Sequence, residues 1–236
     1  MAKSIRPAPL HVTLAVVFQV RERALQVLMW QRGRDPDKGR WALPGGYLDQ
    51  GETLEQSIRR QLAAKVDVRE LAHLEQLETR SEPERNPRGW ELATAYLGLV
   101  PSDVDPAVPA DTAWHPVDPV PPAAFDHGEI VGAGLRRLRA KLSYTNIGFA
   151  LAPDVFTLSE LRTIYVAALG REVSATNLQR VLLRRGVLER TGSKRDPGRT
   201  GGRPAELFRF RAPRLEVTDQ FAVLRPPRRE LRSATR

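Results

Sequence analysis

The 236-residue sequence predicts an α+β protein with two unlike parts. β-Branched apolar runs near the N-terminus predict a sheet, and signatures of helix starts recur after residue 145. The excess positive charge is confined to the second part. From the chain length we expect a domain of about 140 residues beside a smaller one. We place the domains at residues 1–140 and 141–211, followed by a basic, Pro- and Arg-rich tail at 212–236.

The net charge of +9 is distributed unevenly. Residues 141–236 hold 19 Lys and Arg against 9 Asp and Glu, whereas residues 1–140 hold 18 against 19. A basic part beside a nearly neutral one is typical of proteins that bind a phosphate backbone. A solubilising tail is the alternative, but residues 141–224 keep a net charge of +6 without the Arg225–Arg236 segment.

Composition excludes several other classes. The sequence has no run of 18 apolar residues and no apolar signal-peptide core, so we expect a soluble, cytoplasmic protein that does not enter a membrane. It has no cysteine, which excludes disulfides and thiolate metal sites. The apolar content of 41% is enough for a real hydrophobic core.

Strands dominate the first part. Two β-branched runs separated by Arg21–Arg23 predict a hairpin, and a Pro-containing segment then enters a Gly-Gly loop. Gly45 and Gly46 permit backbone angles closed to other residues, so we expect close approach to a ligand there. The expected strands are His11 to Val20, Ala24 to Gln31, Arg40 to Leu48, Leu71 to Thr79 and Trp90 to Val100. We expect the charged loop Ser81 to Arg88 at the mouth of a pocket.

Two helices are expected in this part. After Thr53, apolar residues recur every four positions through Val66, which predicts an amphipathic helix packed on the sheet. A second helix is predicted to begin at Asp126, because Glu129 follows at the spacing of a capping box. We expect this second helix to connect the two parts of the chain.

The second part has the element order of a winged helix-turn-helix. Thr157 to Glu160 forms a capping-box signature whose helix ends at Gly170, and a further helix begins at Ser174 and stops at Gly186. The tight turn between the two helices is of the helix-turn-helix kind. Strands at Val187 to Arg190 and Ala205 to Arg211 then flank a basic segment.

The stretch Leu43 to Val68 resembles the Nudix box. It reads Leu-Pro-Gly-Gly-Tyr-Leu-Asp-Gln-Gly-Glu-Thr before the predicted helix, and Gly46, Glu52 and Arg60 have the spacing of that family. The run Arg40 to Gly46 is also characteristic of the superfamily. The resemblance implies a Nudix α/β/α sandwich with a mixed sheet.

The same stretch departs from the family at its metal-binding positions. Where Nudix hydrolases carry glutamates, this sequence has Gln61, Ala64 and Lys65. Hard divalent cations require oxygen ligands, and an ammonium group repels them. We therefore predict no catalytic residue, no metal site and no cofactor. The alternative is an active ADP-ribose pyrophosphatase with unusual metal ligands, for which Glu52 and Glu55 remain.

The chain also resembles the Nudix-related transcriptional regulators of NAD metabolism. The resemblance covers residues 8–211 and includes the segments Phe-Asp-His-Gly-Glu-Ile, Phe-Thr-Leu-Ser-Glu-Leu and Gly-Gly-Arg-Pro-Ala-Glu-Leu-Phe-Arg-Phe. It implies a homodimeric repressor that senses ADP-ribose or a related nucleotide and binds palindromic double-stranded DNA operators of NAD biosynthesis or salvage genes. An RNA-binding protein is a weaker alternative, because an aromatic platform for bases is lacking.

Arginine, glycine and tryptophan dominate the expected effector site, because guanidinium groups match phosphate oxygens and indole rings stack on bases. The ligand-binding candidates are Arg32, Arg34, Arg40, Trp41, Gly45, Gly46, Glu52, Arg60 and Arg88. Trp30 and Trp90 are further stacking candidates.

The expected DNA site combines the start of the second short helix with the basic wing. Asn and Gln suit adenine and Arg suits guanine, and wing cations suit phosphate or the minor groove. An ordinary solvated helix face is the alternative. The candidates are Ser174, Thr176, Asn177, Gln179, Arg180, Lys194, Arg195, Arg199 and Arg203.

Overall fold

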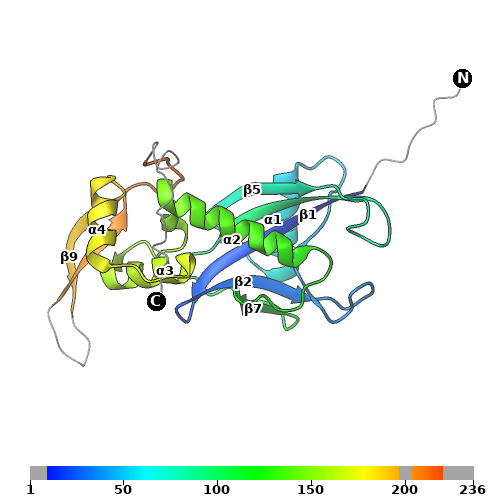
Figure 1. Ribbon diagram of the computed structural model, residues 1–236, viewed down its shortest axis with the longest axis horizontal. Coiled ribbons are helices and arrows are strands. Elements are labelled where there is room, and N and C mark those ends of the chain that lie inside the picture. The colour runs from blue at the N-terminus through cyan, green and yellow to red at the C-terminus, as the bar shows by residue number, and fades with distance from the viewer. Residues whose placement is uncertain (1–9, 197–203, 220–236) are drawn as a thin grey trace, which may run out of the picture.

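The computed structural model describes residues 10–196 and 204–219. The N-terminal part is built on one mixed sheet of seven strands within those residues (Figure 1). The strands are β1 (Leu10–Arg21), β2 (Ala24–Gln31), β3 (Trp41–Ala42), β4 (Gly45–Tyr47), β5 (His73–Arg80), β6 (Glu91–Leu99) and β7 (Thr112–Pro116). The predicted hairpin and long strands are confirmed.

Strand β1 is central to the sheet. The order is β3-β2-β1-β6-β5, with β4 also paired to β1 and β7 to β2. β1 and β6 run parallel, and the other pairs are antiparallel. Residues 12–20 of β1 are all buried, as expected for a strand covered on both faces.

The two faces are covered by different helices. α1 (Leu54–Val66) packs Ile58, Leu62 and Val66 on one face, and α2 (His127–Tyr144) packs Ile130 and Leu138 on the other. The predicted α/β/α sandwich with a mixed sheet is confirmed. Within the described residues, no helix is both long and apolar enough to cross a membrane.

One predicted helix start and one predicted strand differ in detail. Asp126 is the N-cap of α2, but its side chain makes no capping hydrogen bond, so the predicted capping box is wrong. Its carboxylate instead accepts hydrogen bonds from Arg85, and Glu129 accepts one from Arg80. The single strand predicted at Arg40 to Leu48 is divided into β3 and β4. The division falls at Pro44, which cannot donate to a ladder.

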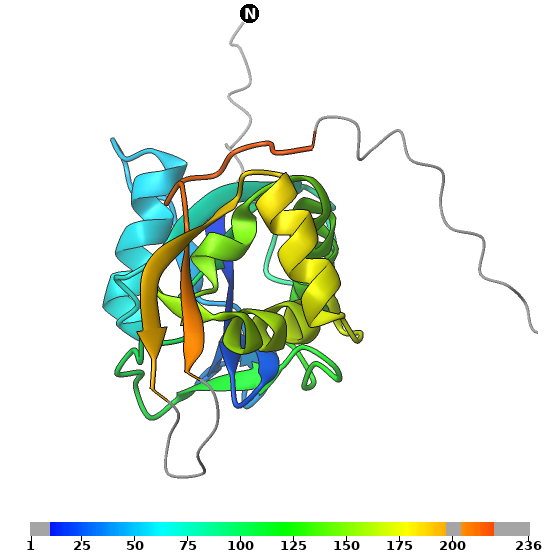
Figure 2. The same cartoon turned by 90° about the vertical axis from the view of Figure 1, so that its left-hand side faces the viewer.

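The C-terminal part confirms the winged helix. Its elements are η1 (Ile147–Ala150), β8 (Phe156–Thr157), α3 (Leu158–Leu169), α4 (Ala175–Arg184), β9 (Leu188–Arg195) and β10 (Ala205–Phe210). Thr157 and Glu160 form the predicted capping box, and Gly170 ends α3 in the left-handed conformation. β9 is longer than expected, because Lys194 pairs with Glu206 and Arg195 with Ala205. Figure 2 views this part end-on.

The two parts share a core across their junction. α2 spans the length between them, and the boundary proposed after residue 140 falls inside this helix (Figure 1). Phe18 and Leu25 of the sheet belong to the same buried cluster as Leu161 and Ile164 of α3. The winged helix is therefore packed on the sheet domain rather than attached through a linker alone.

Residues 212–219 pack back against this junction. The Asn146 side chain donates to the carbonyl oxygens of Ala212 and Arg214, at 3.3 and 2.8 Å. Arg185, at the end of α4, donates from Nε to the Thr218 hydroxyl at 2.9 Å. The sequence predicts this segment to be part of the tail, but it is hydrogen-bonded to residues at the C-terminal ends of α2 and α4.

Candidate functional site

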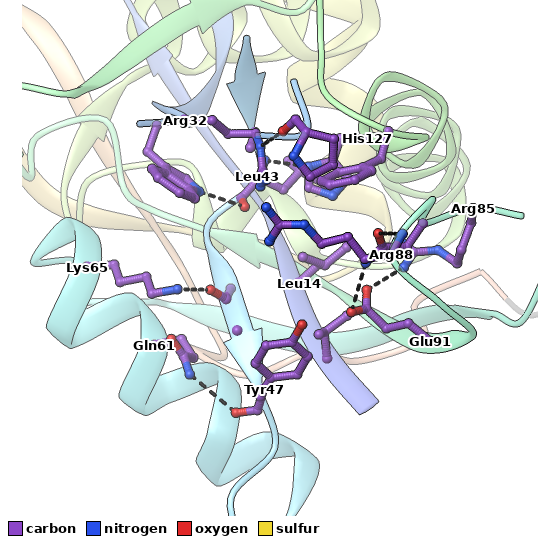
Figure 3. A pocket seen from close by; sticks show the side chains of 18 of the residues that line it. Leu14, Arg32, Leu43, Tyr47, Gln61, Lys65, Arg85, Arg88, Glu91 and His127 are labelled. Atoms are coloured by element: carbon purple, nitrogen blue, oxygen red, sulfur yellow. Dashed lines mark hydrogen bonds and ion pairs between the residues drawn. The ribbon is translucent and has the colours of Figure 1, made fainter. Parts of the chain in front are cut away.

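A cavity of about 360 Å³ opens where β4, α1, the loop before β6 and the start of α2 converge (Figure 3). Five predicted ligand-binding residues line it: Arg32, Arg34, Gly45, Gly46 and Arg88. Trp30 also lines it, whereas Trp90 does not. The polar and aromatic lining residues outside the predicted ligand-binding set are Tyr47, Asp49, Gln61, Lys65, Arg85, Asn86, Glu91, Phe125 and His127.

Four of the lining cations have no carboxylate within ion-pairing distance in the described part of the chain: Arg32, Arg34, Lys65 and Arg88. Arg32 lies over the Phe125 ring, 4.6 Å from its centroid, and its Nε donates to the Pro36 carbonyl oxygen. Arg88 donates to the Asp35 carbonyl oxygen. Burial lowers the pKa of the Arg32 guanidinium. The negative charge of Asp37 raises this pKa, and the positive charges of Arg34 and Arg88 lower it. These cations repel one another, so an anion in the cavity would be stabilised by all of them.

Lys65 reaches the cavity from α1. Its Nζ donates to the Gly45 carbonyl oxygen at 2.5 Å and lies 5.7 Å from the centroid of the Trp30 ring (Figure 3). Burial lowers the pKa of the Lys65 amine, and the charges of nearby arginines, Arg34 foremost, lower it further. The ammonium group is thus held in place by a carbonyl dipole and an aromatic face.

A buried ionic network supports one wall. The Arg85 side chain is only 3% exposed and contacts Glu91 Oε1 and Asp126 Oδ1, both at 2.9 Å. Asn86 donates to the other oxygen of Glu91 at 3.2 Å. The network joins the loop before β6 to the start of α2. It also neutralises Glu91, which is one of the two acidic residues that line the cavity.

His127 and Trp30 hold the backbone of Leu43 from two sides. The Leu43 amide donates to His127 Nδ1 at 2.9 Å, and Trp30 Nε1 donates to the Leu43 carbonyl oxygen at 3.1 Å. Because Nδ1 accepts, the proton of the neutral ring is on Nε2. Burial lowers the pKa of His127 to about 4. These contacts position the Leu-Pro-Gly-Gly segment.

The glycines line the cavity for a different reason than expected. Neither Gly45 nor Gly46 has a positive φ, so the predicted special backbone angles are wrong. A Cβ on Gly45 would lie 2.0 Å from the Thr13 carbonyl oxygen, and one on Gly46 would lie 2.6 Å from the Gln61 amide. Close packing of β4 on β1 and α1 therefore requires glycine at these positions.

Four other predicted ligand-binding residues do not line the cavity: Arg40, Trp41, Glu52 and Arg60. Arg40 pairs with Asp37 at 3.4 Å, and Trp41 packs edge-on against His115 with ring centroids 4.1 Å apart. Arg40 precedes β3 and its guanidinium also donates to the Ala123 carbonyl oxygen at 3.4 Å, whereas Trp41 lies on β3 and packs against the hydrophobic core.

Glu52 and Arg60 form an exposed ion pair over the loop that leads into α1. Arg60 donates to Glu52 and to the Tyr47 carbonyl oxygen, and Glu52 also accepts from the Asp49 amide at 2.7 Å. The Arg60 hydrogen bond, followed by that amide, lowers the pKa of Glu52 to about 2. The pair fixes the turn and does not reach into the cavity.

The residues at the expected metal positions do not fit a divalent cation. Gln61 is buried and its amide nitrogen donates to the Tyr47 carbonyl oxygen at 3.4 Å. Ala64 has no ligand atom in its side chain, and Lys65 brings a positive charge. Glu55 is paired with Arg59. Among the described residues, no cluster of three His, Asp or Glu could hold a metal ion.

The second candidate site is the outer face of α4. Ser174, Thr176, Asn177 and Arg180 are exposed and Gln179 is half-buried, whereas Leu178 and Leu182 face the core. Val181, the third apolar residue of this part of α4, is only half-buried. Arg180 donates to the Asn177 side-chain oxygen at 2.8 Å. All five polar candidates are thus available on one exposed helix.

The wing is described only in part. Lys194 and Arg195 are exposed on β9, and Arg195 pairs with Glu160 at 2.5 Å. Arg199 and Arg203 lie outside the described residues. Figure 1 shows α4 and β9 at the same end of the molecule.

Two family models match the chain. The NUDIX domain matches residues 9–132, and the NrtR DNA-binding winged helix domain matches residues 148–210.

Among curated relatives, the "ADPR responsive transcriptional repressor NtrR" of Acinetobacter baylyi is 33% identical over 88% of this chain and 84% of its own length. An "ADP-ribose pyrophosphatase" of Methanocaldococcus jannaschii is 30% identical over 52% of this chain and 72% of its own length.

Among solved structures, Shewanella oneidensis NrtR complexed with a 27mer DNA has a TM-score of 0.74 at 34% identity, covering 86% of this chain and 93% of that one. The NUDIX domain of the same protein complexed with ADP ribose has a TM-score of 0.51 at 33% identity, covering 58% of this chain and 94% of that one.

Proposed function

The chain belongs to the Nudix superfamily and to the NrtR-like transcriptional repressors, and from this premise we propose that it is a DNA-binding repressor whose effector is ADP-ribose or a closely related nucleotide. Its two ligands would bind at separate sites, the effector in the cavity beside β4 and the DNA on the face of α4. The residues assigned to each site are part of this proposal.

The four cations of the cavity carry the effector assignment. Arg32, Arg34, Lys65 and Arg88 line one concave space, and Arg32, Lys65 and Arg88 donate to backbone carbonyl oxygens. A diphosphate would supply the missing negative charge through charge-assisted hydrogen bonds. Trp30, Tyr47 and Phe125 provide apolar surface for a base or a sugar, as in other nucleotide pockets.

The exposed face of α4 supports the DNA assignment. In helix-turn-helix proteins the second helix enters the major groove with its N-terminal residues leading. Thr176, Asn177 and Arg180 occupy that part of α4. Lys194 on β9 would contact the phosphate backbone. The likeness to Shewanella oneidensis NrtR, which was solved complexed with a 27mer DNA, supports DNA as the partner.

We further propose that this Nudix domain binds its nucleotide without hydrolysing it. Gln61, Ala64 and Lys65 do not provide the oxygen ligands that a catalytic divalent cation needs. A repressor that does not hydrolyse its effector also leaves the effector concentration, to which it responds, unchanged. Release of AMP from ADP-ribose in the presence of Mg²⁺ would contradict this part of the proposal.

Dimerisation, location and targets complete the proposal. A palindromic operator matches a two-fold homodimer whose α4 helices lie about 34 Å apart, one turn of DNA. The targets would be genes of NAD biosynthesis or salvage, and repression would take place in the cytoplasm.

Binding of labelled DNA from upstream of such genes tests the proposal. We expect purified protein to bind this DNA more tightly than random duplex at physiological salt, and calorimetry to detect stoichiometric ADP-ribose binding. Equal affinity for random DNA would contradict the repressor assignment. Absence of ADP-ribose binding would contradict the effector assignment.

A further inference from the structure

Lys65 lines the cavity proposed for the effector, yet it makes no ion pair within the described residues. Its ammonium group is fixed by the Gly45 carbonyl oxygen at 2.5 Å and by the Trp30 ring. It points into the cavity from α1, on the side opposite Arg88 (Figure 3). One carbonyl hydrogen bond leaves two further N–H donors of the ammonium group for a ligand.

The groups around Lys65 favour an anion over a second cation. Arg32 and Arg34 line the same cavity, and both lower the pKa of Lys65. Of the acidic lining residues, Glu91 is bound by Arg85 and Asp49 pairs with Arg60 at 2.9 Å. A divalent cation at this point would be repelled by three fixed charges, and nearby carboxylates are already engaged.

We propose that Lys65 is the built-in counterion of a diphosphate site that binds its nucleotide without any divalent metal. The proposal rests on the proposed effector function and deepens it, since it assigns the role of a bridging cation to a side chain of this protein. Arg32, Arg34 and Arg88 would contact the remaining phosphate oxygens. The site therefore selects a nucleoside diphosphate in its metal-free form.

Calorimetric titration of the full chain with ADP-ribose tests the proposal first. We expect the same dissociation constant, within about twofold, in 5 mM Mg²⁺ and in excess EDTA. Affinity that falls tenfold or more on chelation would overturn the proposal and leave the effector function standing. Absence of binding in both buffers would overturn both.

Substitution of Lys65 gives the second test. Lys65→Met keeps most of the apolar stem and removes the charge, and we expect about tenfold weaker ADP-ribose binding. Binding of adenosine, which has no phosphate, should change by less than about twofold. Arg59→Ala is the matched control, because it removes a positive charge from the same helix outside the cavity.

A purely structural role for Lys65 predicts a different pattern. If the lysine only ties α1 to β4, then Lys65→Met lowers the melting temperature but leaves the affinity for ADP-ribose unchanged. That result would overturn the proposal. If the variant does not fold, the comparison of Mg²⁺ with EDTA on the unchanged protein still decides the question.

Discussion

The cavity and the winged helix both carry positive charge, but they hold it differently. In the cavity, Arg32 and Lys65 are fixed by carbonyl oxygens and rings and have no carboxylate partner among the described residues. In the winged helix, Arg195 pairs with Glu160 and Arg209 with Glu189 at the exposed surface. A preorganised concave site suits one small anion, whereas exposed exchangeable pairs suit a long polyanion that displaces counterions.

The largest expected effect contrasts the ionic pairs of the two regions. Arg85→Ala leaves the buried Glu91 without its arginine partner and leaves Asp126 with Arg80 at 3.7 Å, so we expect a loss of about 3 kcal/mol in the free energy of unfolding. Arg209→Ala breaks an exposed pair and should cost less than about 1 kcal/mol. Urea denaturation measures both. Equal losses of unfolding free energy in the two variants would show that the buried ion pair is worth no more than the exposed one.

The next effect concerns sequence recognition by α4. Arg180→Ala should weaken operator binding by about 1–3 kcal/mol and relax the preference at one base position. It should leave ADP-ribose affinity unchanged, because Arg180 is exposed on the winged helix and does not line the cavity. Anisotropy with operator variants measures this. If the variant keeps the base preference of the unchanged protein, Arg180 contacts no base, and it either contacts a phosphate or faces solvent.

A smaller effect should appear as a pH dependence of stability. Burial lowers the pKa of His127, so below pH 6.5 the unfolded chain takes up a proton that the folded chain does not. Stability should therefore fall as the pH drops through this range, by at most about 1.4 kcal/mol per pH unit, until the folded-state pKa is reached.

His127→Asn is the matched variant for this test. Asn can still accept a hydrogen bond from the Leu43 amide but does not titrate. Melting temperatures measured between pH 7 and pH 5 should show a shallower slope for the variant. Parallel slopes would assign the acid sensitivity to other groups, such as His115, whose pKa burial also lowers.

The smallest effect is expected at the wing. Lys194 is exposed and reads no base in our assignment, so Lys194→Ala should weaken all DNA sequences alike. The slope of log affinity against log salt should decrease by about 1. An unchanged slope would remove Lys194 from the DNA interface.

Local patterns predicted the fold well where neighbours in sequence decide the structure. The capping box at Thr157 and the left-handed stop at Gly170 are confirmed, because these contacts lie within one turn. The predicted capping box at Asp126 is wrong, because Arg85, 41 residues away, takes the carboxylate. A pattern within four residues cannot reveal that competition.

The cavity was harder to predict for the same reason. Guanidinium chemistry predicts Arg32 and Arg88 as ligand-binding residues, but the sequence does not reveal which arginines face inward, and Arg40 does not line the cavity. The sequence does not predict the role of His127, because its partner, Leu43, is 84 residues away. The Phe-Asp-His segment predicts a helix start and carries part of the family resemblance, but neither pattern places the His127 ring beside Leu43.

Thermodynamic coupling between the two regions tests the central claim most directly. The affinity for operator DNA would be measured with and without saturating ADP-ribose, and the affinity for ADP-ribose with and without operator. We predict a change of about fivefold or more in the first, and the same factor in the second, since linkage makes the coupling reciprocal. Operator affinity unchanged by ADP-ribose that is bound in the cavity would contradict the account.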